Sequence, residues 1–231
     1  MHPIIKRARS EGRAVLTEIE SKELLGRAGI NVIDTRLATS AAEATTISKE
    51  LGFPVVLKIT SPDIVHKSDT GGVKLGLETP EQVEHAYDEI LRDIAQKFPE
   101  ANVQGISVQK MAQPGIEVII GMFKDIQFGP VVMFGLGGVW VEIIEDIALG
   151  VTPLTQRDAR EMIAEIKGYR MLTGYRDQQP VDISKLEEML LLVSKFAVKN
   201  PTVKELDLNP VIARSDGAVA VDARMVLEDS Q

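Results

Sequence analysis

Residues 53–77 read FPVVLKITSPDIVHKSDTGGVKLGL, two strand-like segments joined by a polar loop that ends in two glycines. The first segment is apolar apart from Lys58. The loop contains His66, so an imidazole is presented on backbone that is expected to be free to move. A histidine in such a loop, close to a strand lysine, suggests phosphate chemistry. The alternative is an ordinary polar loop residue.

The other two histidines are expected to lie outside any site. His85 falls off the apolar stripe of a helix that is predicted to begin after Thr79, with Thr79 and Gln82 as its capping box. We therefore expect His85 to be a solvated surface residue. His2 lies at a terminus that is expected to be frayed.

The composition is that of an ordinary globular protein with an acidic balance. The chain has 231 residues, 26 Lys and Arg against 34 Asp and Glu, and a pI near 5.0. These charges argue against nucleic acid or an anionic membrane as a partner, because either would need a basic face. Cysteine is absent, which excludes disulfides, zinc–thiolate sites and thiol nucleophiles. No stretch approaches the roughly 20 apolar residues of a membrane span, and we expect a cytoplasmic protein.

Alternating helix and strand signals predict an α/β (α+β) fold with two lobes. Residues 1–16 are expected to be a mobile N-terminal extension, and residues 17–231 one domain with lobes of about 17–108 and 109–231. A ligand is expected in the cleft between lobes. Capping boxes at Thr17–Glu20 and Ser40–Glu43 predict two further helices, and two more helices are predicted near residues 155–166 and 182–199. Strands are predicted at residues 30–39, 55–59, 73–77, 105–111, 117–123, 129–137 and 139–145.

The last part of the chain predicts a β-hairpin around Asp216-Gly217, formed by residues 204–214 and 218–227. A loop built on these two residues would pair position 211 with 222 and 209 with 224. Strand alternation would then place four polar side chains on one face: Asp207, Asn209, Asp222 and Arg224. Carboxylate and amide oxygens are ligands that suit Mg²⁺ shared with nucleotide phosphates. The alternative is a polar sheet edge, and a three-residue loop would turn Asp222 to the opposite face.

Lys58 also points to an anion. An unpaired ammonium in an apolar strand is costly, so a nucleotide phosphate is one expected partner and a snorkel to solvent is the alternative. The chain contains neither G-x-x-x-x-G-K-[ST] nor G-x-G-x-x-G, so a Walker or Rossmann phosphate loop is not supported. Gly71-Gly72 and the FGLGG stretch at 134–138 are turns that could each present backbone N–H groups to a phosphate.

Taken in order, several segments resemble one family, the ATP-grasp β subunits of ADP-forming acetyl-CoA (acyl-CoA) synthetases, which are relatives of succinyl-CoA synthetase. The resemblance covers about residues 17–228 and implies an ATP-grasp fold with the nucleotide between two lobes. HKSD followed by Gly-Gly, and FGLGG, are specific because they are not general ATP-grasp features. The segments are the Lys58 strand, SPDIVHKSDTGGVKLGL (61–77), QKMAQPGIEVIIGM (109–122), FGPVVMFGLGGVWVE (128–142) and ELDLNPV (205–211).

The resemblance implies the reaction acyl-CoA + ADP + phosphate ⇌ acid + ATP + CoA, with the phosphoryl group carried on histidine. His66 matches the loop histidine that delivers this group to ADP. The implied partner is a CoA-binding α subunit in an α₂β₂ heterotetramer, and the implied cofactors are Mg²⁺ and ADP/ATP. The other matched positions are Lys58 on the nucleotide phosphates, Gln109, Lys110 and Met111 at the adenine hinge, Glu117 on the ribose, and Asn209 and Asp222 on Mg²⁺ with Asp207 as an additional or outer ligand.

The chain departs from the family pattern at two points. Asp177 stands where glycine is expected after GYR, and the spacing from Asn209 to Asp222 is one residue shorter than in the succinyl-CoA relatives. The second departure weakens the match at Asp222. Asp69 or Glu142 is expected to fix the tautomer of the histidine ring, and the sequence does not choose between them.

Two other functions are compatible with an ATP-grasp sequence. One is a regulatory nucleotide-binding module without turnover, which the retained His66 and metal positions disfavour. The other is an ATP-grasp carboxylate–amine ligase, which forms an acyl phosphate and has no need of the HKSD loop. The acid that is used, ADP against GDP, and the physiological direction are not determined by the sequence.

Overall fold

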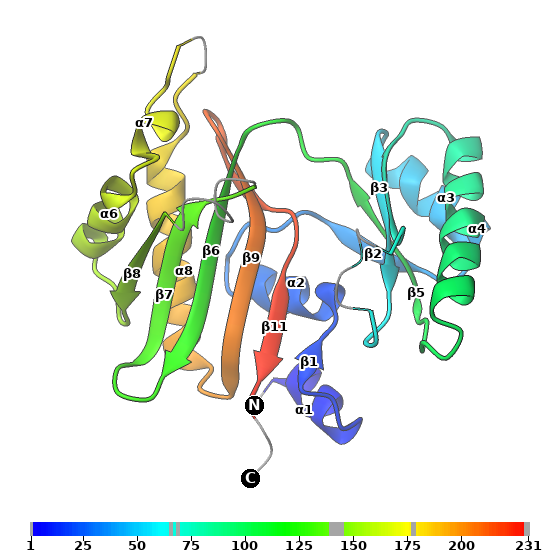
Figure 1. Cartoon of the computed structure of the whole chain (residues 1–231), viewed down its shortest axis with the longest axis horizontal. Coiled ribbons are helices and arrows are strands. Elements are labelled where there is room, and N and C mark those ends of the chain that lie inside the picture. The colour runs from blue at the N-terminus through cyan, green and yellow to red at the C-terminus, as the bar shows by residue number, and fades with distance from the viewer. Residues whose placement is uncertain (1, 65–66, 68–69, 139–145, 177–178, 229–231) are drawn as a thin grey trace. The chain divides into compact units, whose positions relative to one another are not determined.

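The computed structural model describes residues 2–64, 67, 70–138, 146–176 and 179–228 (Figure 1). The chain forms two compact units. The larger unit combines Met1–Val32 with Pro114–Gln231, and the smaller unit is Ile33–Gln113. These bounds differ from the expected lobes, because residues 17–32 pack with the C-terminal half of the chain.

The N-terminal residues form a packed helix in place of the expected mobile extension. Helix α1 (Pro3–Ser10) begins at His2, whose Nδ1 accepts a hydrogen bond from the Ile4 N–H at 3.3 Å. Ile4, Ile5 and Ala8 are buried in the core of the larger unit. The apolar residues of this short segment therefore contribute to folding, and the terminus is not frayed at His2.

The larger unit is built on an antiparallel sheet with its helices packed on one face (Figure 1). Its strands are β1 (Val15–Leu16), β6 (Ile116–Asp125), β7 (Gly129–Leu136), β8 (Ile147–Val151), β9 (Val203–Arg214), β10 (Gly217–Ala220) and β11 (Arg224–Leu227). Their order is β1-β11-β9-β6-β7-β8, and β10 pairs with β9. The helices besides α1 are α2 (Glu18–Arg27), α6 (Gln156–Glu165), α7 (Tyr169–Leu172) and α8 (Ile183–Lys199).

The smaller unit is a four-stranded antiparallel sheet against which two helices pack. The strand order is β2-β5-β3-β4. Antiparallel pairing in both units gives an α+β architecture, which helix and strand signals alone do not distinguish from a parallel sheet. The elements are β2 (Thr35–Ala38), α3 (Ala41–Leu51), β3 (Val55–Thr60), β4 (Val73–Leu77), α4 (Pro80–Lys97) and β5 (Gly105–Lys110).

The predicted capped helix starts are confirmed. Thr17 and Glu20 form the complete box: the Thr17 hydroxyl accepts from the Glu20 N–H at 3.2 Å, and the Glu20 carboxylate accepts from the Thr17 N–H at 2.9 Å. At the other two starts, Ser40 and Thr79 cap as predicted, but the reciprocal side chain accepts from the N–H one residue earlier: Glu43 from Thr39, and Gln82 from Glu78. Local sequence signals therefore located these helix starts correctly.

Several strands differ from the prediction. The strand predicted over residues 30–39 is shortened to β2, and the last predicted strand is divided into β10 and β11. The prediction missed β8, a short strand whose sequence, IALGV, contains a glycine that weakens the strand signal. The strand predicted at 139–145 lies outside the described residues. Within the described part of the chain, no helix has the length and apolar character needed to cross a membrane.

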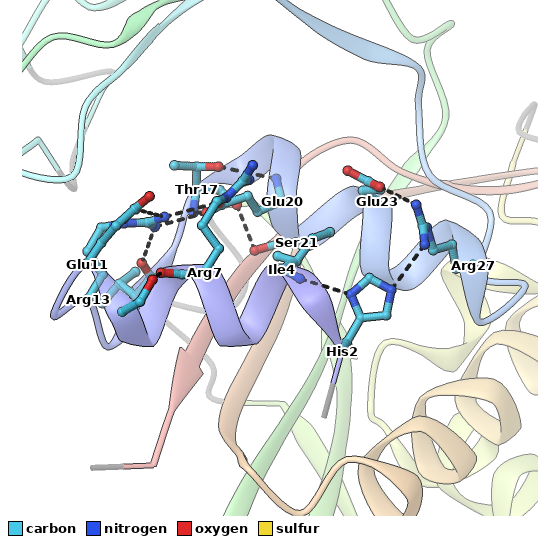
Figure 2. A network of polar contacts seen from close by, with 12 residues as sticks. His2, Ile4, Arg7, Glu11, Arg13, Thr17, Glu20, Ser21, Glu23 and Arg27 are labelled. Atoms are coloured by element: carbon cyan, nitrogen blue, oxygen red, sulfur yellow. Dashed lines mark hydrogen bonds and ion pairs between the residues drawn. The ribbon is translucent and has the colours of Figure 1, made fainter. Parts of the chain in front are cut away.

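A polar network connects α1 to the start of α2 (Figure 2). The Glu20 side chain is 8% exposed and accepts hydrogen bonds at 2.9 Å from Arg13 and from Arg7. Burial acts to raise the pKa of Glu20, but the guanidinium groups and the Thr17 N–H outweigh it and hold the pKa at about 2. The charged form of this carboxyl is therefore stabilised by folding.

This pKa predicts a pH-dependent stability. The ordinary pKa of the Glu20 carboxyl is 4.5, so its stabilisation is fully present above about pH 4.5 and is lost as the pH falls toward about 2. We expect Glu20→Gln to lower the free energy of unfolding at pH 7 by about 2–3 kcal/mol and to flatten its pH dependence in that window. Urea unfolding between pH 7 and pH 3 measures both effects.

Glu23→Gln is the matched control. It removes an exposed ion pair with Arg27 in the same helix, and the expected loss is below about 1 kcal/mol with no change in the pH dependence. Equal losses in the two variants would contradict the special role of Glu20.

Candidate active site

The terminal hairpin turns one residue earlier than the sequence predicted. Gly217 pairs with Arg214, which leaves Ser215-Asp216 as the turn. The Arg214 guanidinium donates to the Asp216 carboxylate across this turn, at 2.9 and 3.0 Å. The predicted pairs are therefore wrong by two residues in register: 209 with 224, and 211 with 222.

A register shift of two residues leaves every side chain on its original face. Asp207 lies directly opposite Arg224. β10 and β11 pair with β9 in the same register. Counting residues in this register across the break between β10 and β11 places Asp222 opposite Asn209. The leucines that alternate with Asp207 are buried in the core. The predicted polar set therefore shares the opposite face of the sheet.

The carboxyl groups of this set interact. Burial raises the pKa of Asp207, the nearby charge of Asp222 raises it further, and Arg224 opposes both effects. Two carboxylates close enough to repel each other attract a cation, and the Asn209 amide adds a third hard oxygen donor. These residues fit Mg²⁺. The described residues contain no group of three or more His, Cys, Asp or Glu able to hold a metal ion, so the set depends on the amide of Asn209.

Glu117 lies on the same face of the larger unit's sheet. It is exposed in β6, opposite Ile212, and its neighbour Val118 points into the core. The Glu117 carbonyl oxygen accepts from the Gly137 N–H at 2.7 Å. A Cβ at Gly138, where φ is +64°, would lie 3.2 Å from Glu117 Oε2. Gly137 and Gly138, the last two glycines of the FGLGG stretch, therefore lie beside Glu117, a proximity that no local sequence signal indicates.

Lys58 is buried in β3 of the smaller unit, with 6% of its surface exposed. Leu57 and Ile59 on either side belong to the apolar core, so Lys58 is on the other face of the sheet. It lies opposite Ser107, whose hydroxyl donates to the Lys58 carbonyl oxygen at 3.2 Å. This burial does not support the alternative of a lysine that snorkels to solvent.

The predicted hinge is at the end of β5. Gln109 and Lys110 are its last residues, and the Gln109 side-chain carbonyl accepts from the Thr35 hydroxyl at 3.3 Å. Met111 follows the strand, and its N–H donates to the Pro54 carbonyl oxygen at 2.9 Å. Because this amide is already engaged, a base bound here would have to contact a carbonyl oxygen or a different amide of the hinge.

The loop that was predicted to carry out the chemistry is described at its two ends. At the first end, Ile64 is buried in the core and the Asp63 carboxylate accepts from the Asn102 N–H at 2.7 Å. At the second end, Lys97 donates to the Thr70 carbonyl oxygen at 2.8 Å. Four residues singled out from the sequence lie outside the described residues: His66, Asp69, Glu142 and Asp177.

The structure arranges the predicted residues in two sets. The set in the larger unit is Glu117, Asp207, Asn209 and Asp222, and the set in the smaller unit is Lys58, Gln109, Lys110 and Met111. Sequence reasoning missed the contacts at the ends of the loop. No signal was available for them, because their partners Asn102 and Lys97 lie far along the chain.

The sequence matches the ATP-grasp domain family over residues 7–227. The chain belongs to this family. It is 46% identical to the β subunit of ADP-forming acetate–CoA ligase I from Pyrococcus furiosus, over 97% of this chain and 96% of the relative. It is 45% identical to ADP-forming acetate–CoA ligase I from Archaeoglobus fulgidus, over 97% of this chain but 32% of that longer relative. The ATP-grasp domain therefore occurs both as a separate β subunit and within a longer chain.

Solved structures of an ATP-grasp relative agree with the fold. Acetyl-coenzyme A synthetase 1 from Ca. Korarchaeum cryptofilum, in complex with coenzyme A and Ca-AMPCP, has a TM-score of 0.96 and 48% identity, covering 97% of this chain and 98% of that chain. The same protein has been solved with a phosphorylated phosphohistidine segment in a site I orientation. It has also been solved with Mg-AMPPCP and this segment pointing towards the nucleotide-binding site.

Substitutions on the polar face of the larger unit's sheet test whether this face binds a metal ion. We expect Asn209→Ala and Asp222→Asn each to weaken nucleotide binding at least about ten-fold in the presence of Mg²⁺ and to leave metal-free binding near its wild-type value. Isothermal titration calorimetry with ADP, with Mg²⁺ and with EDTA, measures both affinities. Asp216→Asn, in the turn of the same hairpin, is the control and is expected to change neither. Equal losses with and without Mg²⁺ would remove both residues from the metal site.

Proposed function

We propose that this chain is the β subunit of an ADP-forming acetyl-CoA (acyl-CoA) synthetase, an acid–thiol ligase. The observation that carries the proposal is the end-to-end similarity to such a β subunit, 46% over 97% of this chain, together with the retained HKSDTGG loop. The burial of Lys58 and the shared face of the metal set support the same assignment. His66 is the proposed catalytic residue.

The proposed step is a phosphoryl transfer between histidine and nucleotide. The P–N bond of phosphorylated His66 breaks, a P–O bond forms to the terminal phosphate oxygen of ADP, and the ring nitrogen is left as a neutral imidazole. Lys58 neutralises phosphate charge, the hinge at the end of β5 holds the base, and Glu117 holds the ribose. Asn209 and Asp222, with Asp207, would hold Mg²⁺, which would supply further charge neutralisation. Alignment and electrostatics are most of what this reaction requires of a protein.

The CoA chemistry is assigned to a partner. The relative from Archaeoglobus fulgidus contains this domain as 32% of its length, whereas the Pyrococcus furiosus relative is a separate β subunit. The described surface of this chain also exposes large apolar side chains, of which Ile126, Leu75 and Phe128 are the most exposed. Apolar exposure of this kind is typical of a subunit surface. The proposed partner is a CoA-binding α subunit, in an α₂β₂ assembly.

Two alternatives receive less support. A regulatory module does not need a phosphoryl-accepting histidine, and this chain retains His66. A carboxylate–amine ligase has no use for the HKSD loop, and the similar proteins described above are acetate–CoA ligases.

The carrier role of His66 predicts a specific covalent label. Incubation with γ-labelled ATP and Mg²⁺ is expected to give an acid-labile, base-stable label, because phosphoramidates hydrolyse in acid whereas phosphoserine and phosphothreonine survive it. His66→Ala should abolish the label and the overall synthetase reaction, and leave nucleotide affinity near wild type, since His66 acts in transfer and not in holding ADP.

His85→Ala is the control, because His85 is exposed on α4, and it should retain both the label and the activity. Synthetase activity that persists in His66→Ala with the partner present would rule out the carrier role.

The subunit assignment predicts a stable complex. Light scattering of this chain mixed with its CoA-binding partner is expected to show a hetero-oligomer, and only the mixture is expected to turn over acyl-CoA. The chain alone should still bind Mg-ADP. A chain that stays monomeric in the mixture would instead favour the regulatory module.

A further inference from the structure

The reach of His66 depends on where the chain is fixed before it. Ile64 lies two residues earlier, is 4% exposed and belongs to the core of the smaller unit. Two residues of fully extended chain span at most about 7 Å. While Ile64 stays in the core, the Cα of His66 therefore remains within about 7 Å of the Cα of Ile64.

A hydrogen bond reinforces this attachment. Asp63 Oδ2 accepts from the backbone N–H of Asn102 at 2.7 Å, and the Asp63 N–H donates to Ser61 Oγ at 3.2 Å. Asn102 lies between α4 and β5, 39 residues along the chain. A charged acceptor makes this bond stronger than a neutral one. The flank before His66 is thus fixed by one buried apolar side chain and one charge-assisted hydrogen bond.

The flank after His66 is fixed by α4. Lys97, in the last turn of this helix, donates to the Thr70 carbonyl oxygen at 2.8 Å. The Thr70 hydroxyl donates to the Lys67 carbonyl oxygen at 2.8 Å, and the Gly72 N–H donates to the same oxygen at 2.9 Å. The Gly72 carbonyl oxygen in turn accepts from the Ile59 N–H at 2.7 Å. This flank is therefore tied to α4 on one side and to β3 on the other.

Gly72 is required for this arrangement. A Cβ at this position would lie 2.5 Å from Ile59 Cγ2 and 3.1 Å from the Lys67 carbonyl oxygen. Ile59 is fully buried, so it cannot yield. Close packing at the end of the loop therefore explains why glycine stands at position 72, the second of the Gly71-Gly72 pair, in addition to any contact with phosphate.

We propose that these attachments form a latch that sets the position of His66 during transfer to the nucleotide. The latch consists of Ile64, the Asp63–Asn102 hydrogen bond and the Lys97–Thr70 hydrogen bond. This proposal rests on the proposed function of His66. Confinement of the segment raises the effective concentration of the imidazole at a bound nucleotide. Ile64, Asp63 and Lys97 are therefore positioning residues.

The latch also limits where His66 can act. While Ile64 is buried, two positions of the His66 Cα cannot lie more than about 14 Å apart, because that distance is the diameter of its range. The segment of the Korarchaeum relative is described in two orientations. Asp63, Asn102 and Lys97 are exposed, so water can replace both hydrogen bonds at small cost, whereas Ile64 must leave an apolar core. Ile64 is thus the principal element of the latch.

Lys97→Met tests the latch with little risk to folding, because Lys97 is exposed. Loss of the bond to Thr70 is expected to increase hydrogen exchange at the Gly72 and Ile59 amides about five-fold. The single-turnover rate of His66 labelling from γ-labelled ATP is expected to fall about five-fold, with unchanged nucleotide affinity. Lys97→Arg retains a donor and should restore both values.

Arg92→Met is the matched control. Arg92 carries the same charge on the exposed surface of the same helix, five residues earlier, so it points in a different direction from Lys97. It should change neither value. Faster exchange without a slower labelling rate would show that Lys97 is merely structural and would overturn the proposal, as would identical behaviour of Lys97→Met and Arg92→Met. A wild-type chain that forms no label would instead refute the proposed function itself.

Ile64→Ala tests the principal element. We expect its labelling rate to fall about ten-fold, because the segment before His66 is no longer fixed. Ile47→Ala removes the same number of atoms from the same core, in α3, and should slow labelling less than about two-fold. Both rates are measured well below the unfolding temperature of each variant. Equal rates in the two variants would overturn the role of Ile64.

Discussion

Alternation of side chains along β9 is the constraint on which the larger unit depends. This strand pairs with β6, β10 and β11, so it organises the centre of the sheet. Leu206 and Leu208 enter the core, and the residues between and after them must point the other way. The same alternation that buries the leucines therefore presents Asp207 and Asn209 on the polar face. One strand thus contributes both to the apolar core and to the candidate metal site.

The first 32 residues complete that unit, although they precede the smaller unit in sequence. Helix α1 contributes apolar side chains to the core, and β1 pairs with β11 at the edge of the sheet. The carboxylate of Glu20 in α2 accepts from Arg7 of α1 and from Arg13 in the segment after α1, and it also completes the helix cap at Thr17. The buried Glu20 carboxylate thus stabilises both the start of α2 and the contacts of α2 with the N-terminal segment. These interactions favour its charged form, which is why folding lowers the pKa of Glu20 so far.

The smaller unit serves the proposed chemistry in a different way. Its sheet buries Lys58 on the face opposite the apolar core, and its helix α4 and the segment after it supply the contacts that hold both flanks of the His66 loop. A phosphoryl carrier has to be confined during transfer and released afterwards. Exposed hydrogen bonds combined with a single buried isoleucine meet both requirements, because only the isoleucine resists release strongly.

The sequence by itself determined whatever depends on near neighbours along the chain. Helix starts at Thr17, Ser40 and Thr79 were predicted correctly because a cap involves residues three apart. The shared face of Asp207 and Asp222 was predicted despite a wrong register, since the error was an even number of residues. The family was identified from ordered motifs, and the ATP-grasp match agrees.

Tertiary structure alone decided the packing of the N-terminal helix, the proximity of Gly138 to Glu117, and the attachment of the loop to Asn102 and Lys97. These contacts join residues distant in sequence, so no local pattern encodes them.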